Sequence, residues 1–214
     1  MEVEIPVDGE NIKGDLNIPK DPKAIILFVH GSGSSRLSPR NRFVAEYFNK
    51  NGFASFLFDL LTSSEERKDT YTAEYRFNIP FLTERLLLSI DWIKEDERIK
   101  GLKVGLFGAS TGAASALIAA AKRKKDIYAV VSRGGRPDLA RDYLQDVEAP
   151  TLLIVGELDY QIIKLNRDVY ALLKCEKKLA IVKGASHLFE EPGKLEEVAM
   201  LATDWFLSKL KKSF

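Results

Sequence analysis

The chain has few of the residues that build disulfides and metal centres. Its 214 residues include one cysteine, Cys175, and two histidines, His30 and His187. A lone cysteine cannot form an internal disulfide, and none of these residues has the spacing of a zinc site. We therefore expect a reduced chain that has no structural metal.

Neither an excess of one charge nor a long hydrophobic run is present. Lysine and arginine number 32 against 31 aspartates and glutamates, a net charge of +1, so we expect no nucleic-acid or membrane partner. The longest apolar stretch, residues 113–121, is far below the ~20 residues of a membrane helix, and the N-terminus lacks a signal-peptide pattern. These features predict a cytoplasmic protein with a small-molecule substrate, and they leave its oligomeric state open.

The composition is that of a folded protein with a substantial core. Hydrophobic residues make up 45% of the sequence and charged residues 29%, as in ordinary globular proteins. No internal repeat and no linker rich in proline, glycine or serine divides the chain. We expect one domain over residues 1–214.

Short apolar runs alternate with longer segments of helical spacing, which predicts a doubly wound, mostly parallel α/β sheet. The predicted strands are residues 24–29, 54–59, 103–107, 128–131, 151–155 and 178–182, and the predicted helices are 43–52, 82–93, 113–122, 162–173 and 195–210. An alternating pattern around Asp8 and Gly9 predicts an antiparallel hairpin at the sheet edge. Basic residues at 122–125 and at Lys211 and Lys212 are expected at helix C-termini.

One turn carries the pattern of a catalytic serine. Residues 108–112 read Gly-Ala-Ser-Thr-Gly, directly after a predicted strand and before an alanine-rich helix. This G-x-S-x-G pattern, in this strand–turn–helix context, is typical of a nucleophile elbow. It predicts that Ser110 is exposed as a nucleophile and that the Thr111 N–H can stabilise an oxyanion.

A second glycine-rich loop follows the strand that ends at Val29. It reads His30-Gly31-Ser32-Gly33, and in this position the Ser32 N–H is the expected second oxyanion donor. A phosphate-binding loop is the rival interpretation, but neither of its common glycine patterns is present. We expect His30 to be held by backbone groups beneath the loop; the alternative is a role as the catalytic base.

An acid and a histidine follow later strands. Asp159 comes after the run 151–155, and His187 comes after the last predicted strand. A histidine is the natural general base near pH 7, and a carboxylate on its other nitrogen fixes the tautomer. Asp138 is the reserve candidate for the acid and Glu157 a poorer one.

The order Ser110, Asp159, His187 resembles that of the α/β-hydrolase superfamily, and within it the small, cap-less branch similar to dienelactone hydrolases. The resemblance runs from His30 to His187, and residues 132–139 also look like that branch. It implies a cofactor-free hydrolase that forms an acyl-enzyme on Ser110, with His187 as base and Asp159 as its orienting acid.

The chain departs from true dienelactone hydrolases in having serine, where those enzymes have cysteine, at the elbow. Serine favours ester, thioester or related acyl transfer. No insertion of 30 to 80 residues separates the predicted strands, so no large lid is expected. The polar segment 60–80 is predicted to be loop-like and is the candidate for a small flap over the site.

Several arginines fall on the predicted active edge of the sheet. Arg133 and Arg136 lie in a loop after a strand, and Arg36 follows the glycine-rich loop. Because guanidinium groups bind carboxylates and phosphates, one hypothesis is a substrate with an anionic group near its acyl carbon. The alternative is that these are solvated arginines or structural pairs with Asp138, Asp142 and Glu46.

The sequence thus predicts a serine hydrolase of small carboxylic esters or thioesters. Lactonase, peptidase or perhydrolase chemistry would use the same residues, and the sequence does not separate them. A non-catalytic binding protein that kept the scaffold is the remaining alternative.

Overall fold

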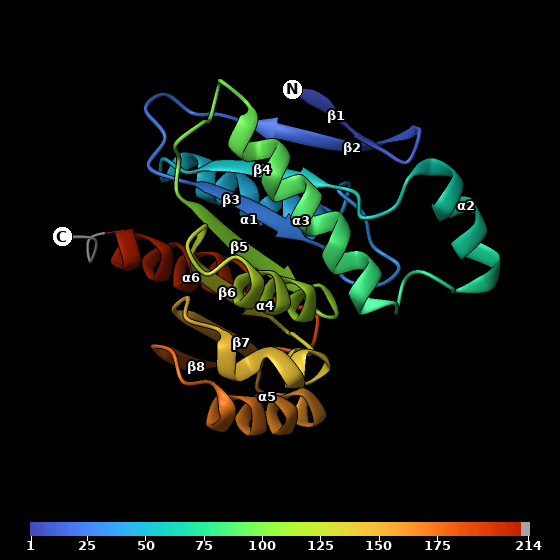
Figure 1. The fold of residues 1–214 in the computed structure, drawn as a ribbon. Helices are drawn as coiled ribbons and strands as arrows, with labels where there is room; N and C mark the ends of the chain where they lie inside the picture. The colour runs from blue at the N-terminus through green and yellow to red at the C-terminus, as the bar shows by residue number, and fades with distance from the viewer. Residues whose placement is uncertain (211–214) are drawn as a thin grey trace.

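The computed structural model describes residues 1–210, so Lys211 and Lys212 lie outside the described residues. Eight strands form one sheet in the order β1-β2-β4-β3-β5-β6-β7-β8 (Figure 1). The strands are β1 (Glu2–Val7), β2 (Glu10–Asn17), β3 (Ile25–Val29), β4 (Ala54–Phe58), β5 (Val104–Ala109), β6 (Ile127–Arg133), β7 (Thr151–Gly156) and β8 (Lys177–Val182). The helical segments are α1 (Pro39–Lys50), α2 (Ser63–Thr72), α3 (Ile79–Glu95), α4 (Gly112–Lys122), the 3-10 segment η1 (Pro137–Asp146), α5 (Tyr160–Leu172) and α6 (Lys194–Leu210).

The predicted hairpin and the predicted parallel sheet are both confirmed. Strands β1 and β2 pair antiparallel through a turn at Asp8 and Gly9, whose φ angles of 48° and 82° suit a tight hairpin. Strand β2 is also antiparallel to β4, and every later pairing is parallel. The carboxyl ends of β3, β5, β6, β7 and β8 therefore meet at one edge of the sheet, where ligands bind in such folds.

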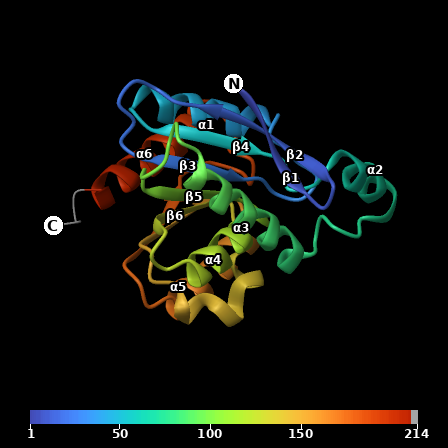
Figure 2. The same ribbon diagram turned by 45° about the horizontal axis from the view of Figure 1, so that its top comes forward.

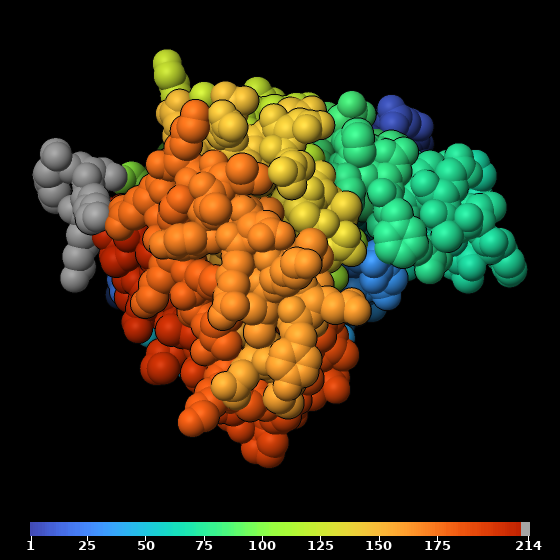
Figure 3. Space-filling model, turned by 90° about the horizontal axis from the view of Figure 1, so that it is seen from below, coloured from blue at the N-terminus to red at the C-terminus, as the bar shows by residue number. Residues whose placement is uncertain are grey.

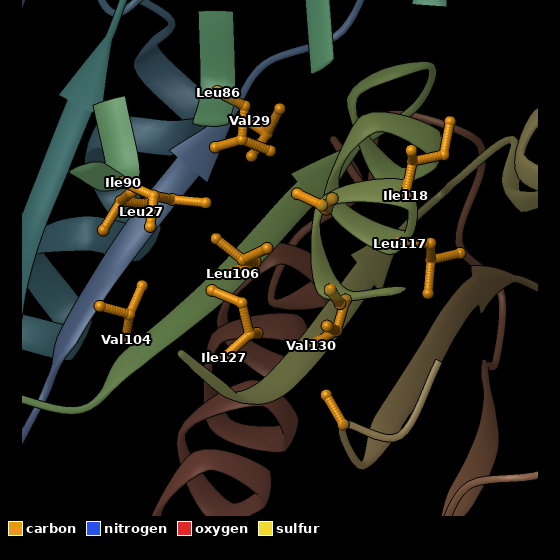
Figure 4. Close-up of a cluster of buried hydrophobic side chains, with 14 of the residues drawn as sticks. Leu27, Val29, Leu86, Ile90, Val104, Leu106, Leu117, Ile118, Ile127 and Val130 are labelled. Carbon is orange, nitrogen blue, oxygen red and sulfur yellow. The ribbon is translucent and has the colours of Figure 1, made fainter. Parts of the chain in front are cut away.

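Helices cover both faces of the sheet, with α3, α4 and α5 on one side and α1 and α6 on the other (Figures 1 and 2). The side chains of successive β3 residues point to opposite faces of the sheet, as the two-residue period of a strand requires. Leu27 and Val29 join the core beneath α3 and α4, which Figure 4 shows, whereas Phe28 packs toward α1 and α6. Burial on both faces explains why these strands are apolar throughout.

The segment 60–80 differs from its prediction as a loop. Residues 63–72 form α2, which stands out at the side of the molecule (Figures 2 and 3). Thr62 begins the helix with a reciprocal capping box to Glu65, and Asp69 is its one buried residue. With no apolar face there was no helical period to detect, and the Thr-x-x-Glu spacing was the available signal.

The segment η1 is not among the predicted elements; it is a short 3-10 segment of ten residues with a kink at Ala140. Within residues 1–210, no helix combines the length and the apolar character that spanning a bilayer requires.

Candidate active site

The turn after β5 has the strained geometry of a nucleophile elbow. Ser110 follows the last residue of β5 and has a φ of 50°, a left-handed conformation that non-glycine residues rarely adopt. Its N–H donates to the Arg133 carbonyl oxygen at 3.2 Å, and its own carbonyl oxygen accepts from the Ala113 and Arg136 N–H groups at 3.1 and 2.9 Å. These bonds offset the cost of holding the serine in this conformation.

Two glycines flank this turn because strand and helix approach too closely for a side chain. A Cβ on Gly108 would lie 2.5 Å from the Ala113 Cα, and one on Gly112 would lie 2.2 Å from the Val29 carbonyl oxygen. Both contacts are shorter than real structures tolerate, so the G-x-S-x-G pattern is a packing requirement as well as a motif.

The start of α4 lies directly beside Ser110. Thr111 is the N-cap residue of α4 and makes no capping hydrogen bond with its side chain. No capping side chain occupies the amide groups of this turn, although the Ala113 and Ala114 N–H groups donate to the Ser110 and Thr111 carbonyl oxygens, and the helix end carries partial positive charge. This agrees with what a developing oxyanion would need at this place.

The Ser32 N–H has a different partner from the one predicted. It donates to the Thr111 Oγ1 at 2.8 Å, so the expected second oxyanion donor is occupied by a side chain. No sequence pattern indicates this contact, because Ser32 and Thr111 are 79 positions apart. The role of both amides as oxyanion donors stays a prediction.

His30 is a buried structural residue, as expected. Its Nδ1 donates to the Gly31 carbonyl oxygen at 3.0 Å, and its Nε2 accepts from the Leu60 N–H at 3.2 Å. The acceptor role of Nε2 requires a neutral ring, and burial lowers the pKa of His30 below its ordinary 6.5. With both nitrogens engaged, His30 is unsuited to act as the base.

This burial predicts acid sensitivity. Below pH 6.5 the unfolded chain protonates His30 while the folded protein does not, so the free energy of unfolding falls as pH drops toward the lowered folded pKa. The slope from this one group is at most about 1.4 kcal/mol per pH unit. Urea unfolding at pH 7.5, 6.5 and 5.5 should show a flatter profile for His30→Asn than for the wild type. Parallel profiles would contradict the assignment.

The carboxylate and the histidine chosen from the sequence are brought together. Asp159 Oδ2 lies 2.6 Å from His187 Nδ1, and the side chains are 14% and 38% exposed. The two loops are tied by backbone bonds, including one of 2.9 Å from the Leu158 N–H to the Ala185 carbonyl oxygen. Within residues 1–210 no hydrogen bond joins Ser110 Oγ to His187, a contact that often forms only with substrate bound.

The reserve candidates for the acid have other partners. Asp138 accepts two hydrogen bonds from Arg136, at 2.9 and 2.8 Å. Glu157 accepts from the Gly184 N–H at 2.8 Å. Only Asp159 of these three contacts His187.

The structure separates the three arginines proposed to bind substrate. Arg36 forms ion pairs with Glu2, Asp15 and Asp59 at 2.9 to 3.1 Å. It is therefore a structural residue, which corrects the expectation that it binds substrate. Its carboxylates come from two hairpin strands and the loop after β4, which only the folded sheet brings near. Arg136 likewise pairs with Asp138, as the structural alternative held.

Arg133 differs from both, because it is 7% exposed and bonds only weakly, through Nη2 to Asn41 Oδ1 at 3.4 Å. Asn41 lies on α1, and no motif in the sequence indicates its contact with Arg133.

A cavity of about 290 Å³ lies beside the glycine-rich loop. Its walls are the loop 30–34, Leu60, Leu61, Leu82 and part of α2 with Arg76. Asp69 on α2 forms an ion pair with Arg76 at 2.7 Å, which ties the helix to the segment that follows it. The proposed flap thus lines a cavity at the active edge; a movement of it stays a prediction.

Within the part of the chain that the structure describes, no three histidine, cysteine, aspartate or glutamate side chains cluster to hold a metal ion.

Two curated proteins that are much longer than this chain are similar to it in sequence. The chain is 49% identical over 209 residues to the "Putative phosphoribosyl transferase" of two Mycobacterium tuberculosis strains, a match covering 98% of this chain. It spans only 46% of those relatives' length, so their name describes proteins about twice as long.

Solved structures share this fold over nearly the whole chain. The dienelactone hydrolase of Anabaena variabilis is 51% identical with a TM-score of 0.95, over 97% of this chain and 96% of that one. Est1E of Butyrivibrio proteoclasticus has a TM-score of 0.83 at 16% identity, over 99% of both chains, which shows a shared fold alone. The dienelactone hydrolase family model matches residues 12–210, which include the elbow, the glycine-rich loop and the Asp159–His187 pair. By this match over nearly its whole length, the chain belongs to the dienelactone hydrolase family.

Proposed function

We propose that the protein is a serine hydrolase that cleaves a small carboxylic ester or thioester through an acyl-enzyme intermediate. The observation that carries the proposal is the placement of Ser110. It occupies a left-handed turn between β5 and α4, at the same sheet edge as the Asp159–His187 pair. The tight elbow exposes a hydroxyl that an adjacent base can activate.

In the first half-reaction, His187 Nε2 takes the proton of Ser110 as Oγ bonds to the substrate carbonyl carbon. The Thr111 N–H stabilises the resulting oxyanion, joined by the Ser32 N–H once it leaves the Thr111 hydroxyl. The Asp159 carboxylate, 2.6 Å from Nδ1, stabilises the imidazolium.

The tetrahedral intermediate then collapses: the bond to the alcohol or thiol breaks, and His187 protonates the leaving group. Water repeats the sequence on the acyl-enzyme, with His187 again as base. The acid is released, and Ser110 regains its proton.

The size of the neighbouring cavity supports a small substrate. At about 290 Å³ it lies at the lower end of ligand pockets in general, and it adjoins the loop that carries Ser32. Leu60, Leu61 and Leu82 supply apolar wall, which suits a short acyl or alcohol group.

The same residues would serve a lactone, a peptide or a peracid, so these substrates remain alternatives within the proposal. Est1E, which shares the fold, has been solved with ferulic acid bound, so this architecture can hold a carboxylic acid. The transferase name of the longer relatives applies to proteins of which this chain is under half. The single-domain organisation and cytoplasmic location remain predictions.

A fluorophosphonate probe tests the proposal directly. The folded wild type should be labelled once, at Ser110, because only an activated serine reacts quickly with such probes; peptide mass spectrometry identifies the site. Heat-denatured protein should be unlabelled, and Ser115, buried in α4, is an internal control. Folded protein that resists the probe would favour the non-catalytic scaffold.

A further inference from the structure

The backbone at Arg133 adjoins both parts of the proposed catalytic site, the Ser110 turn and the His187 loop. It ends β6, and its carbonyl oxygen accepts the Ser110 N–H at 3.2 Å. The next residue, Gly134, packs against the His187 loop, where an added Cβ would lie 3.1 Å from the His187 carbonyl oxygen. The backbone at Arg133 therefore lies beside both parts of the proposed site, and its guanidinium reaches Asn41 on α1.

The guanidinium of Arg133 is buried without a counter-charge. Within residues 1–210 its one hydrogen bond goes to the neutral Asn41 amide oxygen at 3.4 Å, and its Nε has no acceptor. Burial lowers the pKa of Arg133 to about 10, and repulsion from Arg40 contributes. An unpaired buried charge is costly, which calls for an explanation in function.

Other buried arginines of the protein do have carboxylate partners. Arg85, with 5% of its side chain exposed, bonds Asp8 and Glu65 at 3.0 and 2.6 Å. Arg36, at 12%, contacts three carboxylates. Arg133 is as buried as these and has none, so its missing anion is a specific property of this place.

A second cation and a helix end face the same region. Arg40, in the first turn of α1, has a buried Nε without an acceptor, while its Nη1 reaches Glu190, a carboxylate 61% exposed. Water screens that exposed pair strongly. The first turn of α1 contains no acidic residue, and its N-terminus adds partial positive charge.

We propose that Arg133 and Arg40 form a binding site for a phosphate group beside Ser110. Two guanidinium groups with unused Nε–H donors match the three terminal oxygens of a phosphate monoester, and its double negative charge offsets both cations. A carboxylate has the charge for one arginine only. The phosphate is either part of the ester substrate, which rests on the proposed function, or free inorganic phosphate.

Binding is tested by thermal unfolding with sodium phosphate at pH 7.5, against sodium chloride and sodium acetate of equal ionic strength. At a phosphate concentration about 100-fold above its Kd, the wild-type Tm should rise by about 5–10 °C. Arg133→Met should lose this rise and have a higher Tm than the wild type without phosphate, because the unpaired charge is gone. Arg40→Gln should weaken the rise, and Arg123→Met, far from the site on the surface, should keep it.

A phosphate effect no larger than that of chloride, an equal effect of acetate, or an unchanged effect in Arg133→Met would overturn the proposal. These readouts need no turnover and should persist in Ser110→Ala. Failure of the hydrolase proposal is therefore distinguishable from failure of the phosphate site.

Kinetics then distinguish the two sources. If the phosphate belongs to the substrate, an aryl ester whose acyl chain ends in a phosphate should exceed its neutral analogue in kcat/KM by about 10-fold or more. Arg133→Met should abolish this advantage, and inorganic phosphate should compete with the ester. Phosphate binding that leaves ester hydrolysis unaffected would instead support the free-phosphate form of the site.

Discussion

Replacing Ser110 by alanine is expected to lower kcat for p-nitrophenyl acetate at least about 10³-fold. The change removes the one atom, Oγ, that would bond to the acyl carbon, and it leaves the glycines and backbone bonds of the turn in place. Residual turnover would come from the oxyanion donors and the His187 base acting on water. Initial rates with acetate through octanoate esters would also measure how long an acyl chain the site accepts.

The matched control is Ser115→Ala, five residues later on α4. Ser115 is fully buried and its Oγ has no hydrogen-bond partner within the described residues, so its loss should leave kcat within a few-fold of wild type. Equal rates for wild type and Ser110→Ala would mean that the turnover is adventitious, and the elbow would then be part of a scaffold.

Replacing Asp159 by asparagine is expected to lower kcat by about 10²- to 10⁴-fold with little change in KM. The side chain keeps its size, but an amide NH₂ group facing Nδ1 would favour the tautomer with its proton on Nε2. In that form Nε2 cannot accept the Ser110 proton. The imidazolium also loses the carboxylate that lies 2.6 Å away.

Asp138→Asn tests the same substitution at the reserve position. Asp138 contacts Arg136 rather than His187, so its replacement should change kcat only slightly. A large loss in Asp138→Asn together with normal rates in Asp159→Asn would exchange the roles of the two acids.

The strand and helix pattern could be predicted because it follows from local periodicity and burial. Each parallel strand is apolar throughout, since residues such as Leu27 and Phe28 enter cores on opposite faces. The elbow was visible because the closeness of α4 to β5 requires glycine at 108 and its closeness to the end of β3 requires glycine at 112. By contrast, α2 was missed because its stability comes from capping and ion pairs rather than an apolar face.

The sequence by itself determined the sheet, its hairpin and the loops from which Ser110, Asp159 and His187 would come. Only the tertiary structure decided which of three acids meets His187, that Thr111 occupies the Ser32 N–H, and that Arg133 alone among the candidate arginines lacks an anion. The reason is physical. Hydrophobic periodicity depends on residues that are neighbours in the sequence, whereas the pairing of a charge depends on side chains that distant strands bring within a few ångströms.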